Sequence, residues 1–456
     1  MLYLFHSQEF MLFFVVIFVI YWISKRFKNA VLLIASYIFY ASWDWRFLSL
    51  IVALTAINYF CGLKIEASKH RKAYLLIGII SGISILGFFK YFNFFVESFV
   101  TLLNFFGFGL NYNALNIILP IGISFYTFQT LSYTIDVYRK KMSPEKNIIN
   151  FSLFVFYFPQ LIAGPIERAK DLLPRINSTK NIRNINFRDG SYLFIYGLFK
   201  KVVIADSLAI IVDKVFSMQD PTGTQVMMAA YAFALQIYCD FSGYSDMAKG
   251  ISHFFGIELS TNFNLPYLSR TPSEFWKRWH ITLSSWVRDY LYIPMGGKNS
   301  KFAALFFSML LMGLWHGAAW HFVLWGLYWF FVIMAYRIIK PKINSLATKV
   351  LSTIVMFHIT SYSWILFRGS DFGQIISLTS SLASINLIGI LDASFFPLYA
   401  GALFLLVYEA IQYTKKDQLF IAKKGFYHQM IFYLVLFFLF VEIGSTSNVA
   451  FIYFQF

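Results

Sequence analysis

The sequence contains very little cysteine and few acidic residues. Only 2 of its 456 residues are cysteine, and both Cys61 and Cys239 lie within apolar sequence. This placement predicts two free, buried thiols and argues against a disulfide scaffold or a redox function. Charged residues make up 13% of the chain, against 58% hydrophobic and 21% aromatic residues. That balance excludes an ordinary soluble domain and predicts a multi-spanning, all-α membrane protein.

Several signatures of known chemistry are also missing. The chain has no GxSxG, no Walker loop and no Rossmann glycine pattern, and no segment repeats with a period of 20 to 50 residues. No acidic residue occurs between Asp289 and Asp371, which argues against a His/His/carboxylate metal site. We expect one integral-membrane domain over residues 1–456, no bound metal and no permanently bound cofactor.

The positive charge is distributed as in a membrane protein. Lysine and arginine number 38 against 22 acidic residues, a net charge of +16, but they occupy short loops between apolar runs. This pattern argues against nucleic-acid binding and marks the cytoplasmic side of the membrane. Lys25, Arg26 and Lys28 follow the first apolar run, so the N-terminus is expected on the extracytoplasmic side of the membrane.

Apolar runs follow one another along the whole chain, and we expect about eleven transmembrane helices, with further re-entrant and interfacial helices. The apolar runs are 11–24, 30–42, 47–63, 73–92, 119–137, 147–165, 191–215, 224–248, 302–336, 350–366, 376–390, 395–413 and 428–443. A basic stretch follows the run that ends near residue 165. Positive-inside topology explains most of its charges, and binding of an anionic substrate is the alternative.

The stretch from residue 271 to 297 predicts a helix lying in the membrane interface. Thr271, Pro272 and Glu274 are a capping hydroxyl, a proline at the first helical position and a carboxylate at the third. Tryptophans fill one side of the helical wheel and basic residues the other, and His280 lies at the boundary.

A second histidine lies in the run 302–336, which is too long for one helix crossing the membrane. Gly313 and Gly317 are the natural place for a break, so His316 is expected at a helix end inside the bilayer. A lone histidine in an apolar run is more often a core residue than a catalytic one. If instead they are catalytic, His280 and His316 would provide a base for proton transfer in a site with little water.

Five long strings then resemble one known family. They are LPIGISFYTFQTLSYTIDVYR (119–139), YFPQLIAGPIERAKDLLP (157–174), YCDFSGYSDMAKG (238–250), FWKRWHITLSSWVRDYLYIPMGG (275–297) and WHGAAWHFVLWG (315–326). In this order they are similar to the membrane-bound O-acyltransferases, most of all to the bacterial branch that acylates peptidoglycan and alginate. Proteins that transfer D-alanine to teichoic acid are more distant relatives.

The resemblance implies a helical fold around a central funnel and transfer of an acetyl group from a cytoplasmic thioester, acetyl-CoA. The acceptor would be an extracytoplasmic glycan, with peptidoglycan as first choice and an alginate-like exopolysaccharide as second. His316 would be the general base and His280 its supporting histidine. Substrate contacts are expected from the following residues: Trp279, Ser284, Arg288, Trp315 and Asp240. For Asp240, a purely structural role is equally open.

The last residues, 444–456, are expected to form an extracytoplasmic tail. An aromatic terminus is either an interfacial anchor or a segment that folds back into the protein. The resemblance implies more, namely that Tyr453 accepts the acyl group and passes it to a periplasmic partner of the serine-esterase (SGNH-like) type.

Three alternatives remain open. In the first, the protein is an enzyme that transfers an acyl group to a lipid, or transfers a D-alanyl group. In the second it transports an intact donor, and in the third it is a scaffold for a periplasmic acetylating complex. Neither the transporter nor the scaffold requires chemistry at His316.

Overall fold

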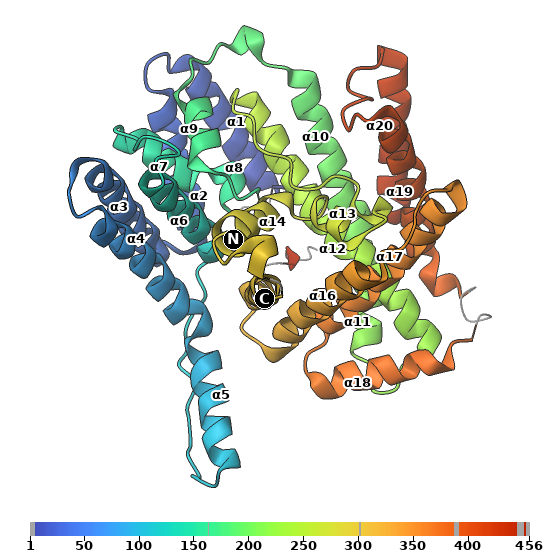
Figure 1. Ribbon diagram of the computed structural model, residues 1–456. Coiled ribbons are helices and arrows are strands. Elements are labelled where there is room, and N and C mark those ends of the chain that lie inside the picture. The colour runs from blue at the N-terminus through green and yellow to red at the C-terminus, as the bar shows by residue number, and fades with distance from the viewer. Residues whose placement is uncertain (1–4, 163, 301, 387–391, 445–450, 453–456) are drawn as a thin grey trace. The chain divides into compact units, whose positions relative to one another are not determined.

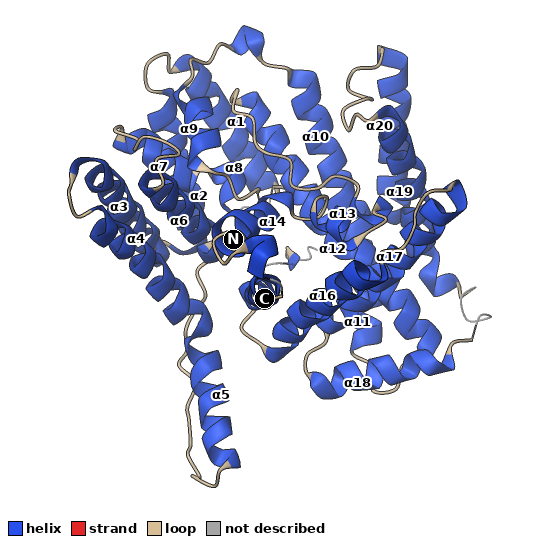
Figure 2. Cartoon of the chain, in the orientation of Figure 1, coloured by secondary structure: helices blue, strands red, loops and turns tan. Residues whose placement is uncertain are grey.

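The structure is a computed structural model that describes residues 5–162, 164–300, 302–386, 392–444 and 451–452. Within these ranges every regular element is a helix and no strand occurs (Figure 2). The all-α fold class is therefore confirmed. Cys61 and Cys239 are both buried and free, as predicted.

The described chain divides into two compact units. The first contains Met1–Asn186 and Ile251–Ser260. Its helices are α1 (Gln8–Ile23), α2 (Lys28–Asp44), α3 (Arg46–Ala67), α4 (Arg71–Leu86), α5 (Phe92–Phe105), α6 (Ile123–Tyr138), α7 (Ile148–Phe156), α8 (Phe158–Leu161) and α9 (Ala169–Asn177).

The second unit contains Phe187–Gly250 and Thr261–Phe456. Its helices are α10 (Phe187–Phe199), α11 (Asp206–Phe216), α12 (Gly223–Phe254, whose last turn belongs to the first unit), α13 (Pro272–Trp276), α14 (Ile281–Val287), α15 (Ala303–His316), α16 (Trp320–Ile339), α17 (Leu346–Arg368), α18 (Phe372–Ser381), α19 (Phe396–Lys415) and α20 (Phe426–Ile443). A π-helical segment, Lys200–Ala205, joins α10 to α11, and another, Arg288–Tyr292, follows α14.

Six helical stretches of the described chain are long and apolar enough to cross a membrane. They are Arg46–Ala67, Arg71–Phe105, Trp320–Ile339, Leu346–Arg368, Phe396–Lys415 and Phe426–Ile443. Shorter apolar helices are Gln8–Ile23, Ile148–Leu161 and Ala303–His316. The chain is thus a polytopic membrane protein, while the count of eleven spans, the funnel and the single domain stay predictions.

In the first unit, α3 and α4 lie side by side (Figure 1), and small residues let α6 pack against them. A side chain at Gly62 would overlap the Tyr133 ring, and one at Gly78 would meet Thr134. Thr134 donates a hydrogen bond to Asn58 Oδ1 at 2.7 Å. The π-helical turn Gly87–Tyr91 carries α4 directly into α5, so Arg71–Phe105 is one continuous helical stretch.

In the second unit, glycine contacts bring α10 close to α12. A Cβ at Gly243 would lie 2.7 Å from the Gly197 carbonyl oxygen, and one at Gly197 would lie 2.5 Å from that of Gly243. Contact between bare backbones sets the π-helical segment Lys200–Ala205 against the acidic residues of α12. The charged groups of the two helices can therefore meet in the interior.

The predicted break in the run 302–336 is present, because α15 ends at His316 and α16 starts at Trp320. The two helices pack through Gly313, whose Cβ would lie 2.2 Å from the Phe322 carbonyl oxygen, and through Gly326, whose Cβ would lie 2.4 Å from that of Met309. Gly317 follows directly and leaves room for the Phe322 ring. His316 is consequently held at a helix end, as expected.

Candidate functional site

The helix expected through His280 is interrupted at His280 itself. It begins as predicted, with the Thr271 hydroxyl accepting the Glu274 N–H at 3.0 Å and Pro272 in the first turn. However, α13 ends at Trp276, and His280 adopts a left-handed backbone (φ 40°) before α14 begins. A single interfacial helix was therefore the wrong prediction for this stretch.

The interruption follows from pairing with a distant segment. Asn264 N–H donates to the Arg278 carbonyl, and Ile281 N–H donates to the Asn262 carbonyl, both at 2.9 Å. These bonds replace helical ones around His280, and a left-handed residue there reverses the chain locally. The histidine is thereby turned inward, where its side chain is fully buried.

Asn262 decides which nitrogen of His280 carries the proton. Its Oδ1 lies 3.0 Å from His280 Nδ1, 2.8 Å from the Thr282 hydroxyl and 3.4 Å from the Thr282 backbone N–H. A backbone N–H can only donate, so the atom facing it is the amide oxygen, and Nδ1 must also donate to that oxygen. In the neutral ring Nε2 then holds the lone pair. This nitrogen can accept a proton or a hydrogen bond, but it cannot donate one to an oxyanion.

Burial keeps this imidazole neutral. Desolvation lowers the pKa of His280 to about 3, because the charged form has lost its water. The rings of Phe241, Phe263 and Trp315 lie at centroid distances of 4.7, 6.4 and 5.8 Å from it. A neutral base in an apolar enclosure suits proton transfer where water is excluded.

His316 lies beside the same tryptophan. Its ring is 5.0 Å from that of Trp315, 5.0 Å from that of Trp325 and 5.2 Å from that of Phe367, and the residue is 4% exposed. Trp315 therefore contacts both histidines, which come from α15 and from the start of α14. The structure brings together two motifs that are 36 positions apart in the numbering.

Asp240 belongs to a buried charge cluster of the same unit. The Lys201 ammonium lies 2.8 Å from Asp240 and 2.7 Å from Asp206, and these three residues are no more than 3% exposed. The second oxygen of Asp240 accepts the backbone N–H of Ile452 at 2.7 Å. Such a cluster is stable only when every charge has partners, and here one partner is the C-terminal tail.

Two described residues of the tail lie close to His280. Phe451 is fully buried and Ile452 is 3% exposed, so these two residues are packed inside the protein. The Phe451 ring lies 4.6 Å from that of Tyr244 and 5.7 Å from that of Phe241, which is itself the ring 4.7 Å from His280. Tyr453, the next residue, lies outside the described residues.

The remaining predicted substrate contacts, Trp279, Ser284 and Arg288, each contact other protein groups. Trp279 is 1% exposed and packs among five rings, those of Tyr238, Phe263, Tyr267, Phe275 and Trp364. The Ser284 hydroxyl donates to the Trp279 carbonyl at 3.2 Å. Arg288 is exposed and pairs with Asp289 at 2.7 Å. Their predicted contacts with substrate stay predictions.

Sequence reasoning missed Asn262, Lys201 and Asp206. No sequence pattern marks Asn262, because its contact with His280 arises only in the tertiary structure. Lys201 could have been recognised, because Lys200 and Lys201 interrupt an apolar run and two lysines there need acidic partners. Lys200 pairs with Asp246 at 2.5 Å and Lys201 pairs with Asp240. Both acidic residues of α12 therefore form an ion pair with a lysine of the segment Lys200–Ala205.

Comparison with known proteins then identifies the chain's family. The model of the membrane-bound O-acyltransferase family matches residues 139–367. The chain belongs to the membrane-bound O-acyltransferase family. It is an O-acyltransferase, and the matched range contains Asp240, Asn262, His280 and His316.

Relatives from three bacteria show the extent of the similarity. A "probable alginate O-acetylase" of Azotobacter vinelandii is 42% identical over 381 residues, which cover 80% of this chain and 75% of the relative. One of Pseudomonas syringae is 39% identical over 435 residues, covering 91% and 83%. A "peptidoglycan O-acetyltransferase" of Helicobacter pylori is 34% identical over 403 residues, covering 80% and 75%.

Proposed function

We propose that this membrane-bound O-acyltransferase transfers an acetyl group from cytoplasmic acetyl-CoA across the bacterial cytoplasmic membrane, for O-acetylation of an extracytoplasmic glycan. The observation that carries the proposal is the meeting of His280 and His316 at Trp315 in an enclosed site. Relatives named for O-acetylation of envelope polymers support the acetyl group and the type of acceptor.

In this mechanism His316 removes the proton of the attacking hydroxyl. The oxygen forms a bond to the thioester carbonyl carbon, the carbon–sulfur bond breaks, and the proton passes to the leaving thiolate. A general base of this kind contributes about 10²- to 10⁴-fold in rate. His280, with Nδ1 turned to Asn262, offers Nε2 as an acceptor, which favours a place in the proton path over stabilisation of the oxyanion.

We propose that the attacking hydroxyl is that of Tyr453. The support is the position of its neighbours, because Ile452 is held by Asp240 and Phe451 packs one ring away from His280. A phenol with a pKa near 10 becomes a useful nucleophile when an imidazole accepts its proton. The acetyl-tyrosine would then be discharged outside by a partner of the serine-esterase (SGNH-like) type.

For the acceptor, the relatives change the order of preference. Peptidoglycan is the first choice from the sequence, yet the two relatives with 42% and 39% identity are named for alginate, and the one named for peptidoglycan is 34% identical. We therefore propose an exopolysaccharide as the acceptor, with peptidoglycan as the alternative.

The deciding experiment is mass spectrometry of purified protein incubated with isotopically labelled acetyl-CoA. We expect label on Tyr453 in the wild type and in the control variants His358→Ala and Tyr427→Phe, whose side chains are exposed. His316→Ala and Tyr453→Phe should abolish it. Turnover without a labelled tyrosine would refute the acyl-tyrosine step.

The same preparation separates the rival functions. A scaffold would keep its partner's activity in His316→Ala provided that the variant folds. A transporter would show altered flux in that variant with no missing acyl-transfer step. Absence of acetyl-CoA turnover even with the partner present would refute the proposed donor.

A further inference from the structure

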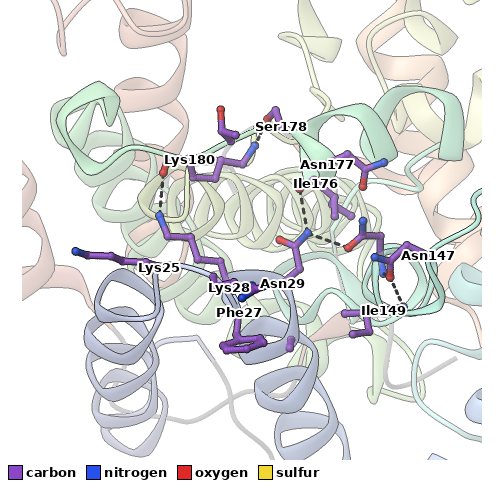
Figure 3. A pocket seen from close by; sticks show the side chains of 14 residues that line it. Lys25, Phe27, Lys28, Asn29, Asn147, Ile149, Ile176, Asn177, Ser178 and Lys180 are labelled. Atoms are coloured by element: carbon purple, nitrogen blue, oxygen red, sulfur yellow. Dashed lines mark hydrogen bonds between the residues drawn. The ribbon is translucent and has the colours of Figure 1, made fainter.

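A polar, basic pocket lies in the first unit, apart from the residues assigned above. It has a volume of about 360 Å³, at the lower end of the range of roughly 300–1,000 Å³ typical of ligand sites. Figure 3 shows its walls, which come from the turn before α2, the start of α7 and the loop after α9.

The charged residues that line this pocket are all positive. Lys25, Arg26, Lys28 and Lys180 line it, and none of its lining residues is acidic. In the described part of the chain, none of these four side chains forms an ion pair. Glu145 accepts the Asn177 amide at 2.9 Å, but Glu145 is not a lining residue. Four cations around a polar pocket create a field that favours an anion.

Two of the cations are held in place by the fold. The Lys28 ammonium donates to the Lys180 carbonyl at 2.8 Å and lies 4.1 Å above the Trp22 ring. The Lys180 ammonium donates to the Arg175 carbonyl and to the Ser178 hydroxyl. Burial, together with the charge of Lys28, lowers the pKa of Lys180 to about 8. A bound anion would offset the repulsion between the Lys28 and Lys180 ammonium groups. Because the fold already orders both side chains, little further ordering is needed to bind it.

The neutral polar side chains of the pocket are asparagine, serine and threonine, and the Asn29 amide is held in place by hydrogen bonds. Asn29 Nδ2 donates to Asn150 Oδ1 at 2.9 Å and to the Ile176 carbonyl at 3.2 Å (Figure 3). Phosphate oxygens only accept hydrogen bonds, and ammonium and guanidinium groups only donate them. A phosphate therefore suits this pocket better than a neutral ligand.

We propose that this pocket binds a phosphate group, carried either by an anionic lipid headgroup or by a soluble phosphate. A lipid source fits the position of the pocket, because Lys25 and Arg26 follow the apolar helix α1 and Phe27, 66% exposed, lies at the pocket. The site would tie the protein to its membrane or to a phosphate-bearing metabolite without touching His280 or His316.

The test uses full-length purified protein, with Lys25→Gln/Arg26→Gln as the main variant because both residues are exposed. The matched control is Lys69→Gln/Lys72→Gln, which removes the same charge from exposed positions of the same unit that do not line the pocket. Lys28→Gln/Lys180→Gln is the second variant, and it is interpreted only where its melting curve shows that it folds.

Two probes separate the sources. Native mass spectrometry measures retention of phosphatidylglycerol against phosphatidylcholine, and the shift of melting temperature is followed with inorganic phosphate against chloride at equal ionic strength. Preferential retention of phosphatidylglycerol, weakened about tenfold or more in the main variant, supports the lipid source. A phosphate-specific shift lost in that variant, without lipid preference, supports the soluble one. No preference with either probe, or equal loss in the control, would overturn the proposal.

Discussion

At the scale of the residue, the chemistry depends on how single side chains are oriented. His280 is an ordinary imidazole made unusual by two contacts, the Asn262 oxygen on Nδ1 and the apolar rings around it. The first assigns the proton to Nδ1, and the second keeps the ring neutral. Neither contact comes from a residue next to His280 in the sequence.

The low pKa of His280 makes stability depend on pH. The unfolded chain binds a proton at this histidine below the ordinary pKa of 6.5, whereas the folded chain does so only near 3. Stability is therefore complete above 6.5 and falls as the pH is lowered toward 3. Between pH 7 and pH 5 this one group should cost about 2 kcal/mol.

Melting temperatures of wild type and His280→Gln, measured across that pH range, check this expectation. The variant should lose less stability on acidification than the wild type does. His70→Gln, at an exposed histidine between α3 and α4, should retain the wild-type slope. Parallel curves for wild type and His280→Gln would contradict a buried neutral imidazole.

At the scale of the element, close backbone contact decides where the charged groups lie. The α10–α12 contact at Gly197 and Gly243 places Lys200 and Lys201 against Asp246 and Asp240. Asp240 in turn holds Ile452, so the packing of two helices also determines where the tail can be held. A helix pair is thus part of the candidate site.

Gly243→Ala tests this packing. Its Cβ would lie 2.7 Å from a backbone oxygen, which cannot move as a flexible side chain does, so the helices must separate. We expect a loss of about 1–3 kcal/mol in stability and a larger loss of acyl transfer. Gly425→Ala, where a Cβ would meet nothing within 4 Å, is the control for thermal unfolding. Equal melting temperatures for the two variants would show that the contact is not required.

At the scale of the whole molecule, the basic loops orient the chain. Trp45 precedes α3 and Lys69 follows it, and both are exposed. Positive-inside topology predicts that Lys69 lies in the cytoplasm and Trp45 outside. The basic pocket, which begins at Lys25, would then face the cytoplasm as well.

Cysteine labelling tests this orientation. In a Cys61→Ala/Cys239→Ala background, Trp45→Cys should react with an impermeant maleimide in right-side-out vesicles. Lys69→Cys should react only after the vesicles are opened. The reverse result would place the proposed phosphate pocket outside and invert the direction of acetyl transfer.

Much of the site could be predicted because its signals are local. Hydrophobic run lengths indicate the helices, the glycines near residue 315 indicate the helix end at His316, and the ordered motifs indicate the family. The break at His280 could not be predicted in this way. A periodic pattern describes one helix, whereas pairing of 262–264 with 278–281 overrides it.

The sequence by itself determined that the protein is helical, lies in a membrane and carries two histidines in an acyltransferase pattern, since run length, charge bias and motif order can all be read along the chain. Only the tertiary structure decided which groups meet. His280 and Asn262 are 18 residues apart, Lys28 and Lys180 are 152 apart, and Asp240 and Ile452 are 212 apart. Hydrogen bonds and charges act over a few ångströms in space, so the proton of His280, the anchored tail and the basic pocket exist only once the chain has folded.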